Sequence, residues 1–233
     1  RHPHRERDRK RSSRDNRMCD VTVISVFYAP APSRVQQVTR QALDAFDACG
    51  MAGDVLLVDN SPSASTDVAR MGCEFARVRT IWNDGYNIYL AGALNRAIDE
   101  AQGEHVVYLC ASHGTAIDPT WLEDLLRPLQ HHTIALSGHV QPCQFNRVAR
   151  VPADVIAPQI HVQGGVWAAR TDLLRQIRFE HRFPFEFCDV DMSRRCLSAG
   201  YELADVPTVR SLAAGTLPHT DGVKFIHDYR EAS

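Results

Sequence analysis

The 233-residue sequence contains no run of 18 apolar residues, so no membrane span is expected. Charge of one sign is not in excess either. The formal net charge is −2, which provides no overall attraction to nucleic acid. Apolar residues make up 44% of the chain and charged residues 23%, which suits one globular domain with a sizeable core. We therefore expect a single folded domain with neither a nucleic-acid partner nor a membrane-spanning segment.

Cysteine patterns and common nucleotide motifs are also missing. The seven cysteines include no C-x-x-C, and eleven histidines occur without H-E-x-x-H. A structural zinc site and a disulfide framework are therefore not expected, and a reducing cytoplasm fits best. Neither G-x-x-x-x-G-K-[ST] nor G-x-G-x-x-G occurs, which leaves a P-loop and a dinucleotide fold without support.

Residues 1–17 are unlike the rest of the chain, with eight Lys or Arg, three acids and no Val, Ile, Leu or Phe. A stretch without apolar residues cannot bury surface to offset the entropy of ordering, so we expect a disordered basic tail. It would be either a basic arm for phosphates or anionic lipid, or an extension upstream of a natural start at Met18. The second interpretation is favoured, and the folded domain is expected at 18–233.

Strand and helix patterns alternate over the first 130 residues. This alternation predicts an α/β fold, with a mostly parallel sheet covered by helices on both faces. In such sheets ligands bind at the carboxyl ends of the strands, so the loops at 27–32, 59–66, 83–86 and 110–118 are the candidate binding loops. Strands are expected at 21–26, 54–58, 75–81, 105–109, 133–136 and 163–169, with edge-like pieces at 203–206 and 209–212. Helices are expected from Ser33 to Gly50, from 88 to 101, from near Pro119, and from Asp189 to Gly200.

Two aspartates, Asp189 and Asp191, open the last of these helices. The positive end of a helix dipole stabilises carboxylates in the first turn, so they stay ionised there. An ionised carboxylate in a cleft can take a proton from a sugar hydroxyl, which makes this segment a candidate general base. The alternative is that both aspartates merely cap a surface helix.

Five segments together resemble the family 2 glycosyltransferases of GT-A fold, and the resemblance spans about 21–216. They are Val58-Asp59-Asn60-Ser61, Asn83-Asp84-Gly85-Tyr86, Ala91-Gly92-Ala93-Leu94-Asn95-Arg96-Ala97-Ile98, Gln163-Gly164-Gly165-Val166-Trp167 and Cys188-Asp189-Val190-Asp191. Each motif is weak alone, but their order and spacing match the family.

The resemblance implies a GT-A, Rossmann-like sheet with a nucleotide-binding half at about 18–118 and a smaller acceptor half at about 119–233. It implies Asp189 as the general base, with Asp191 supporting it. The donor-binding residues would be Tyr28, Ala29, Asp59, Asn83, Gly85, Asn95, Ser112 and His113, and the acceptor side would hold Gly164, Gly165, Trp167 and Arg194. The alternative for Asp59 is an Asx turn, and for Gly85 an ordinary turn glycine.

The sequence departs from the family where two or three aspartates usually hold Mg²⁺ or Mn²⁺ against the diphosphate. Ser112-His113-Gly114 stands there, and the first carboxylate is Asp118. His113 is therefore a metal ligand, or it neutralises the phosphates with backbone N–H groups and no metal, or catalysis has been lost. The second interpretation is favoured, so Mg²⁺ or Mn²⁺ is an uncertain cofactor with its usual acidic ligands absent. Cys188 also replaces a usual glutamate, and Ser211 falls near a usual late histidine.

The favoured function is an inverting transfer of sugar from a nucleoside-diphosphate sugar to a hydroxyl of a glycan or lipid-linked acceptor, as in polysaccharide biosynthesis. The alternative is an inactive GT-A module that binds a nucleotide or glycan. A nucleotidyltransferase is a third possibility. It would need a Gly-, Lys- and Arg-rich loop after the first strand, where Pro30-Ala31-Pro32 stands instead.

Overall fold

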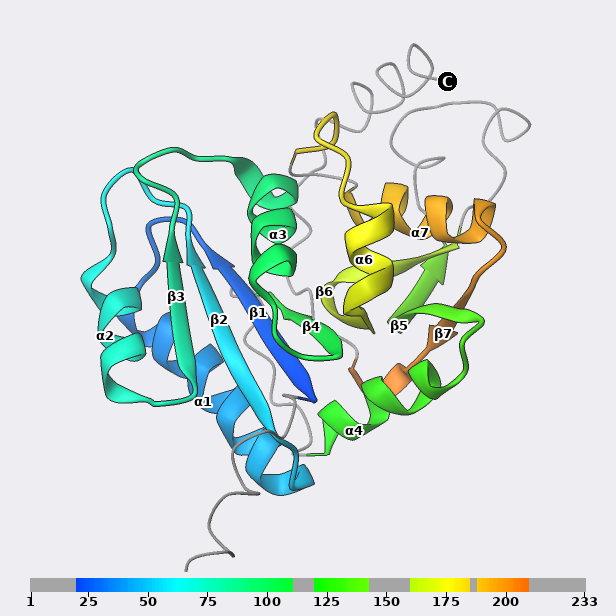
Figure 1. Ribbon diagram of the computed structural model, residues 1–233, viewed down its shortest axis with the longest axis horizontal. Coiled ribbons are helices and arrows are strands. Elements are labelled where there is room, and N and C mark those ends of the chain that lie inside the picture. Colours follow the sequence, from blue (N-terminus) through cyan, green and yellow to red (C-terminus); the bar gives the residue numbers. More distant parts are fainter. Residues whose placement is uncertain (1–19, 111–119, 143–159, 185–187, 210–233) are drawn as a thin grey trace, which may run out of the picture.

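The computed structural model describes residues 20–110, 120–142, 160–184 and 188–209, and Figure 1 shows its arrangement. One seven-stranded sheet runs through it in the order β3-β2-β1-β4-β6-β5-β7. The strands are β1 (Val21–Phe27), β2 (Gly53–Asp59), β3 (Val78–Trp82), β4 (His105–Leu109), β5 (Ile134–Pro142), β6 (Ile160–Arg170) and β7 (Glu202–Asp205). The helices are α1 (Pro32–Cys49), α2 (Thr66–Glu74), α3 (Tyr89–Glu100), α4 (Trp121–Leu126), α6 (Thr171–Ile177) and α7 (Cys188–Ser198), with 3-10 turns η1 (Arg127–Gln130) and η2 (Pro207–Val209).

The sheet is mostly parallel, which confirms the predicted fold class. β1 pairs in parallel with β2 and β4, β2 pairs in parallel with β3, and β5 pairs in parallel with β7. β6 runs antiparallel to both of its neighbours, β4 and β5. This reversed strand matters for the site, because its middle, at Val166, pairs with Leu109 at the carboxyl end of β4.

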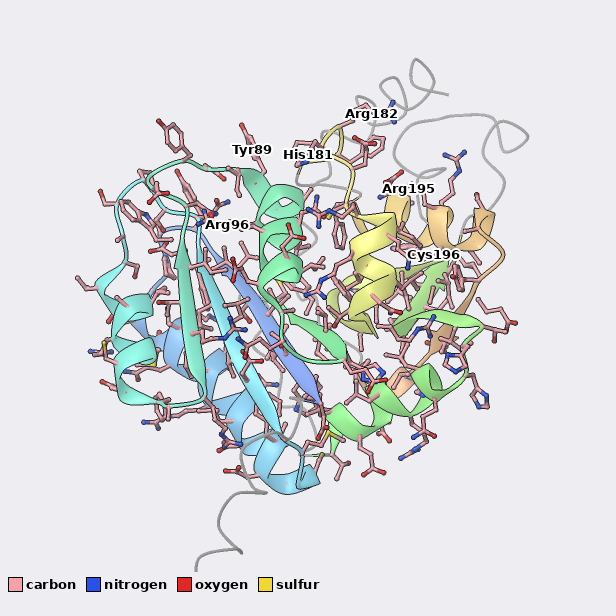
Figure 2. The ribbon with its side chains drawn as sticks, viewed as in Figure 1. Tyr89, Arg96, His181, Arg182, Arg195 and Cys196 are labelled. Carbon is pink, nitrogen blue, oxygen red and sulfur yellow. The ribbon has the colours of Figure 1, made fainter. Side chains whose placement is uncertain are left out.

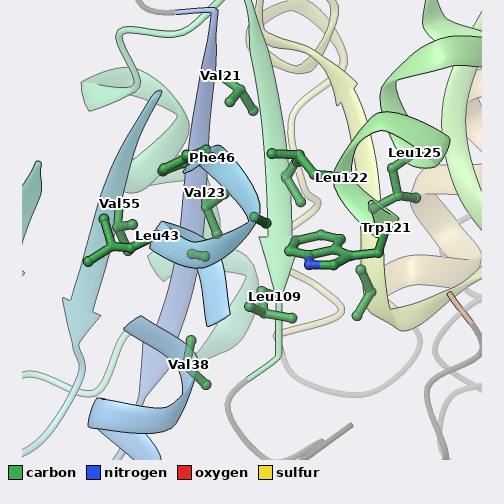
Figure 3. Packing of buried hydrophobic residues seen from close by; sticks show 14 of the residues in the cluster. Val21, Val23, Val38, Leu43, Phe46, Val55, Leu109, Trp121, Leu122 and Leu125 are labelled. Atoms are coloured by element: carbon green, nitrogen blue, oxygen red, sulfur yellow. The ribbon is translucent and has the colours of Figure 1, made fainter. Parts of the chain in front are cut away.

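Helices cover both faces because the inner strands are apolar on both sides. In β1, Val21 and Val23 point into one core cluster and Ile24 points into the other, as the period of two along a strand requires. Figure 3 shows the first cluster, where Phe46 of α1 and Trp121 of α4 pack against the sheet. The second cluster joins the sheet to α3, α6 and α7.

Several expected elements differ in detail. α1 begins at Pro32, with Ala31 as its N-cap, so Ser33 lies inside the helix; the fixed φ of proline suits a first helical position. β6 is continuous through its glycine pair and longer than expected. The segment at 207–209 is a 3-10 turn rather than part of a strand, and 210–212 lies outside the described residues.

Two helices were not predicted at all. α2 follows Ser65, whose hydroxyl caps it by accepting a hydrogen bond from Val68 N–H at 3.4 Å. α6 follows β6 without a connecting loop, starting at Thr171. Among the described helices none is long and apolar enough to cross a membrane. The expected boundary between the two halves, near 118, and the basic tail at 1–17 lie outside the described residues.

Candidate functional site

The carboxyl ends of β1, β2, β3 and β4 meet at one edge of the sheet, the upper edge in Figure 1. β6 reaches the same edge in the opposite direction, because Leu109 at the end of β4 is in register with Val166. Beyond that pair, Cys110 N–H donates to the Gly165 carbonyl at 2.8 Å. The glycine pair is thereby brought to the edge where the binding loops begin, although it comes from a distant part of the chain.

Asp189 lies beside this glycine pair, in the first turn of α7. Its Oδ2 accepts a hydrogen bond from Gly164 N–H at 2.9 Å, and its Oδ1 accepts one from Val190 N–H at 2.9 Å. The side chain remains 23% exposed. A Cβ on Gly164 would come within 3.0 Å of Asp189 Oδ2, so only glycine lets the carboxylate approach this closely.

α7 is held against β6 close to this contact. The Ser193 hydroxyl is fully buried and accepts a hydrogen bond from Val162 N–H at 3.1 Å. Ser193 is one turn along the helix from Asp189, so this bond fixes the position of the first turns of α7, which carry the carboxylate, relative to β6. The placement of Asp189 therefore depends on two bonds from the backbone of β6.

His161 is the main residue that the sequence interpretation missed. It lies on β6, is 7% exposed, and has its Nε2 at 3.9 Å from Asp189 Oδ2. Gln141 of β5 is its register partner, with the Gln141 amide nitrogen 3.5 Å from His161 Nε2. Burial lowers the pKa of His161, while the charge of Asp189 and the Gln141 backbone act in the opposite direction.

Asp191 turns away from Asp189 and joins the structural core. Its carboxylate is only 6% exposed and accepts a hydrogen bond from Arg195 Nε at 2.8 Å. Arg195 also donates to the carbonyls of Ile177 and Arg178, at the end of α6, and Figure 2 shows it on this side of the molecule. Burial raises the pKa of Asp191, and the Arg195 guanidinium opposes that shift. Arg194 is half-buried, and its charge also lowers the pKa of Asp191.

Asp59 ends β2 and is 2% exposed. Its Oδ1 accepts a hydrogen bond from Ser61 N–H at 3.1 Å, and its Oδ2 accepts one from Ser65 N–H. The first of these is the contact of an Asx turn, the alternative that the sequence left open. Both oxygens therefore shape the loop, and any contact with a nucleotide would use their remaining lone pairs.

A network of buried amides connects the loops after β2 and β3. Asn60 Oδ1 accepts hydrogen bonds from Asn83 Nδ2 at 2.8 Å and from Ile88 N–H at 3.1 Å. Asn60 Nδ2 donates to Asn87 Oδ1 at 2.7 Å. Arg96 of α3 donates to Asn83 Oδ1 at 2.7 Å. Asn83, an expected donor-side residue, is thus held between Asn60 and the guanidinium of Arg96. The motif that contains Asn60 did not indicate this role.

The remaining donor-side residues of the first three loops lie at the same edge. Tyr28 is 58% exposed, and Ala29 has a φ of 44° and donates its N–H to the Ser61 hydroxyl at 2.8 Å. Gly85 has a φ of 82°, and a Cβ there would lie 3.0 Å from the Pro62 carbonyl. This turn therefore requires glycine for its conformation and for its close approach to the neighbouring loop.

Asn95 and Trp167 lie in the interior. The Asn95 amide exchanges two hydrogen bonds of 2.8 Å with the backbone of Phe179, 84 residues away. Trp167 is buried, with its ring centroid 5.6 Å from that of Tyr108 and 5.7 Å from that of Phe179. Both side chains join α3 and β6 to the segment after α6, so the structure gives each of them a packing role.

Ser112 and His113 lie outside the described residues. Within the ranges that the structure describes, no group of three or more His, Cys, Asp and Glu side chains is arranged to hold a metal ion. The described residues therefore do not provide a fit for Mg²⁺ or Mn²⁺, and we derive no catalytic step through a metal.

This arrangement defines a class. A mostly parallel sheet whose carboxyl edge meets a glycine pair on one reversed strand and an aspartate at a helix N-terminus is a GT-A architecture. Residues 23–190 match the model of glycosyl transferase family 2, which is more than half of the sequence. The chain belongs to glycosyl transferase family 2.

Solved structures agree on the fold. A mannosyltransferase from Pyrobaculum calidifontis, in complex with GDP-Man and Mn²⁺, superposes with a TM-score of 0.62 at 22% identity over 81% of this chain. This chain spans 55% of the length of that mannosyltransferase. Glucosyl-3-phosphoglycerate synthase from Mycobacterium tuberculosis, in complex with Mn²⁺, UDP and glucosyl-3-phosphoglycerate, gives a TM-score of 0.55 at 15% identity, over 80% of this chain and 69% of that one.

A third structure, CMP:2-keto-3-deoxy-manno-octonic acid synthetase with CTP, gives a TM-score of 0.51 at 13% identity, over 80% of this chain and 89% of that one. No curated protein matches the chain by sequence. At these identities the structural likeness shows the fold alone, and the family rests on the sequence match.

Proposed function

We propose that this protein transfers a sugar from a nucleoside-diphosphate sugar to an acceptor hydroxyl with inversion, and that Asp189 is the general base. The observation that supports it best is the position of Asp189 at the carboxyl edge of the sheet, where Gly164 and Val190 N–H groups hold its carboxylate. Two N–H donors and the helix N-terminus favour the ionised form, which is the form that accepts a proton.

The reaction balances with one proton transfer and one displacement. Asp189 takes the proton of the acceptor hydroxyl as that oxygen attacks the anomeric carbon. The bond from this carbon to the diphosphate oxygen breaks on the opposite face, so the configuration inverts and the diphosphate leaves with the electron pair. General-base assistance of this kind contributes about 10²–10⁴ in rate.

The donor would bind over the loops after β1, β2 and β3. In this proposal Tyr28 and Ala29 line the base pocket, Asp59 accepts from the nucleobase or ribose, and Gly85 allows the backbone to approach. Asn83 is held at the same edge by Asn60, which supports this placement. Ser112 and His113, in the loop after β4, would meet the diphosphate.

The acceptor would enter from the side of β6 and α7, where Gly164, Gly165 and Arg194 lie. Its class is proposed to be a glycan or a lipid-linked glycan, as the family resemblance implies. Asp191 supports the site indirectly, because its pair with Arg195 holds α7 to the end of α6.

The test is a transfer and hydrolysis assay with the purified protein on a panel of UDP-, GDP- and dTDP-sugars, with and without Mn²⁺, for the wild type and Asp189→Asn. We expect turnover of at least one donor, a loss of about 10²–10⁴-fold in the variant, and nucleotide affinity within a few-fold. Near wild-type turnover in Asp189→Asn would assign the base elsewhere. Nucleotide binding without turnover of any donor would instead support the inactive binding module.

A further inference from the structure

We propose that His161 is a positioning residue for Asp189: its Nε2 faces the carboxylate from within the sheet and fixes the orientation of the base. The proposal rests on the proposed role of Asp189 and extends it to a second residue. Nε2 lies 3.9 Å from Asp189 Oδ2, the same oxygen that accepts from Gly164 N–H. His161 and Gly164 both belong to β6, so one strand supplies both groups.

The other ring nitrogen identifies the tautomer. His161 Nδ1 is one of two buried side-chain polar atoms without a hydrogen-bond partner among the described residues. A neutral imidazole carries one proton, and a buried N–H without an acceptor costs about 1–3 kcal/mol. On Nδ1 the proton would be unpaired, whereas on Nε2 it faces the Asp189 carboxylate at 3.9 Å and the Gln141 side-chain amide at 3.5 Å, which presents its oxygen to the ring in this tautomer. The surroundings therefore favour the Nε2–H tautomer, which can donate to Asp189.

The surroundings also favour the neutral imidazole. Burial has the largest effect and lowers the pKa of His161, while Asp189 on α7 and the Gln141 backbone raise it. A second histidine, His139 on β5, lowers it by the smallest effect. His139 itself lies 3.3 Å from Asp205 Oδ1, so its own nearest carboxylate is a different one. A neutral donor beside Asp189 holds the orientation of the carboxylate without forming a strong ion pair, which would make it a weaker base.

A matched pair of substitutions isolates the Nε2 contact. His161→Gln keeps an amide N–H near the position of Nε2, whereas His161→Asn is one methylene shorter and leaves that position empty. Both place a polar amide in the same buried site, so their melting temperatures should fall by similar amounts. His139→Asn removes a neighbouring imidazole that contacts Asp205 and acts on His161 only through its charge, so it is the control for effects that do not need the Nε2 contact.

We expect His161→Asn to lower kcat about 3- to 10-fold at pH 7, the effect of one lost polar contact to the base, with donor KM little changed. Loss of a donor to the carboxylate disfavours the charged form that accepts the proton, so the acid limb of kcat/KM should move to higher pH. His161→Gln should recover most of the rate and the position of the limb. Equal loss in both variants, or an acid limb that does not move in His161→Asn, would overturn the proposal.

A second measurement does not depend on activity. Imidazole ¹⁵N NMR of the wild-type protein should show the Nε2–H tautomer for His161. Asp189→Asn removes the charge that favours the imidazolium, so the pKa of His161 should fall further in that variant. If no donor is turned over, the proposed function fails while this coupling can still be observed. An unchanged His161 pKa in Asp189→Asn, or an Nδ1–H tautomer, would overturn the positioning role even in an active enzyme.

Discussion

Asp191 accepts a hydrogen bond from Arg195 at 2.8 Å, while Asp189, two residues earlier, accepts one from Gly164 at 2.9 Å. Two residues along an α-helix are separated by about 200° around its axis, so the two carboxylates leave α7 on opposite sides. One side faces the core and the end of α6, and the other faces the carboxyl edge of the sheet. The D-x-D sequence of this helix therefore contains one aspartate paired with Arg195 and one that contacts Gly164 at the carboxyl edge of the sheet.

Replacing Arg195 by methionine should destabilise the fold without removing the site-facing carboxylate. The change leaves Asp191 buried without its partner and the carbonyls of Ile177 and Arg178 without a donor. We expect the free energy of unfolding to fall by about 3 kcal/mol at pH 7, since breaking a buried pair is costly. Urea denaturation would measure it. Arg182→Met is the control, because it breaks the ion pair between Arg182 and Glu180, in which both side chains are much more exposed than Asp191.

The same variant should show a distinct pH dependence. Burial already raises the pKa of Asp191 in the folded state, and loss of the guanidinium raises it further. A carboxyl with a raised folded pKa stabilises the protein when it is protonated and loses that contribution as pH rises through the folded value. The deficit of Arg195→Met should therefore be smaller at pH 5 than at pH 7. A deficit that grows on acidification would contradict this account.

Gly164→Ala should reduce activity far more than stability. The new Cβ would meet Asp189 Oδ2 at 3.0 Å, so the carboxylate must shift by a few tenths of an ångström. Displacement of a general base lowers kcat, and we expect about tenfold, with the melting temperature changed by only a few degrees. Gly72→Ala is a matched control. Gly72 lies on α2, away from Asp189, and a Cβ there would meet a Thr80 methyl, also at 3.0 Å. Equal effects of the two substitutions on kcat would argue against the close approach as the reason for glycine.

Asn60→Ala should disrupt the donor-side loops. It removes the acceptor of Asn83 and Ile88 and the donor to Asn87, and leaves buried polar groups unpaired. We expect a loss of about 3 kcal/mol in unfolding free energy and weaker nucleotide binding by calorimetry. Asn87→Ala, at an exposed position in the same network, should cost markedly less. Nucleotide affinity that is unchanged in Asn60→Ala would separate this network from the donor site.

Donor binding is expected to tolerate EDTA and to depend on His113. The prediction comes from the sequence, where Ser112-His113-Gly114 replaces the acidic residues that hold a hard cation. An anion favours protonated His113, so the affinity for UDP should be higher below the pKa of His113 and lower above it. Calorimetry at two pH values, for wild type, His113→Ala and the exposed control His132→Ala, would measure this. Strict dependence on Mn²⁺ would require a metal site that the sequence motifs do not indicate.

The order of the elements could be predicted from the sequence because the inner strands are β-branched on both faces. β4 was predicted at its observed bounds of 105–109, and β1 and β2 within one residue at each end. β3 was placed too early, since Phe75 ends α2 as its C-cap and the strand begins at Val78. α2 itself is only nine residues long and has two buried side chains, Val68 and Met71, so it offers few apolar positions from which a helix could be predicted.

The site could be predicted only in part, because motifs name residues but not their partners. The family resemblance named Asp189 and Gly164 as site residues, but it did not indicate the hydrogen bond between them. The role of Asn95 depends on a contact with Phe179, 84 residues away, and that of His161 on its register beside Gln141. Such pairings join segments that are far apart in the chain and leave no local signal. Trp167 sits next to a site motif and yet faces the core, since side chains alternate along a strand.

The bond between Val162 and Ser193 has a consequence for how such an enzyme diverges. It belongs with Gly164 and His161 to the contacts from β6 that hold the base, whereas Asn60 and its partners hold the loops after β2 and β3. Substitutions at separate sites without shared partners have nearly additive effects. Under the roles proposed above, mutations that change donor choice can then accumulate in the loops after β2 and β3 while Asp189 keeps its alignment. Donor preference and proton transfer would thereby be open to separate selection.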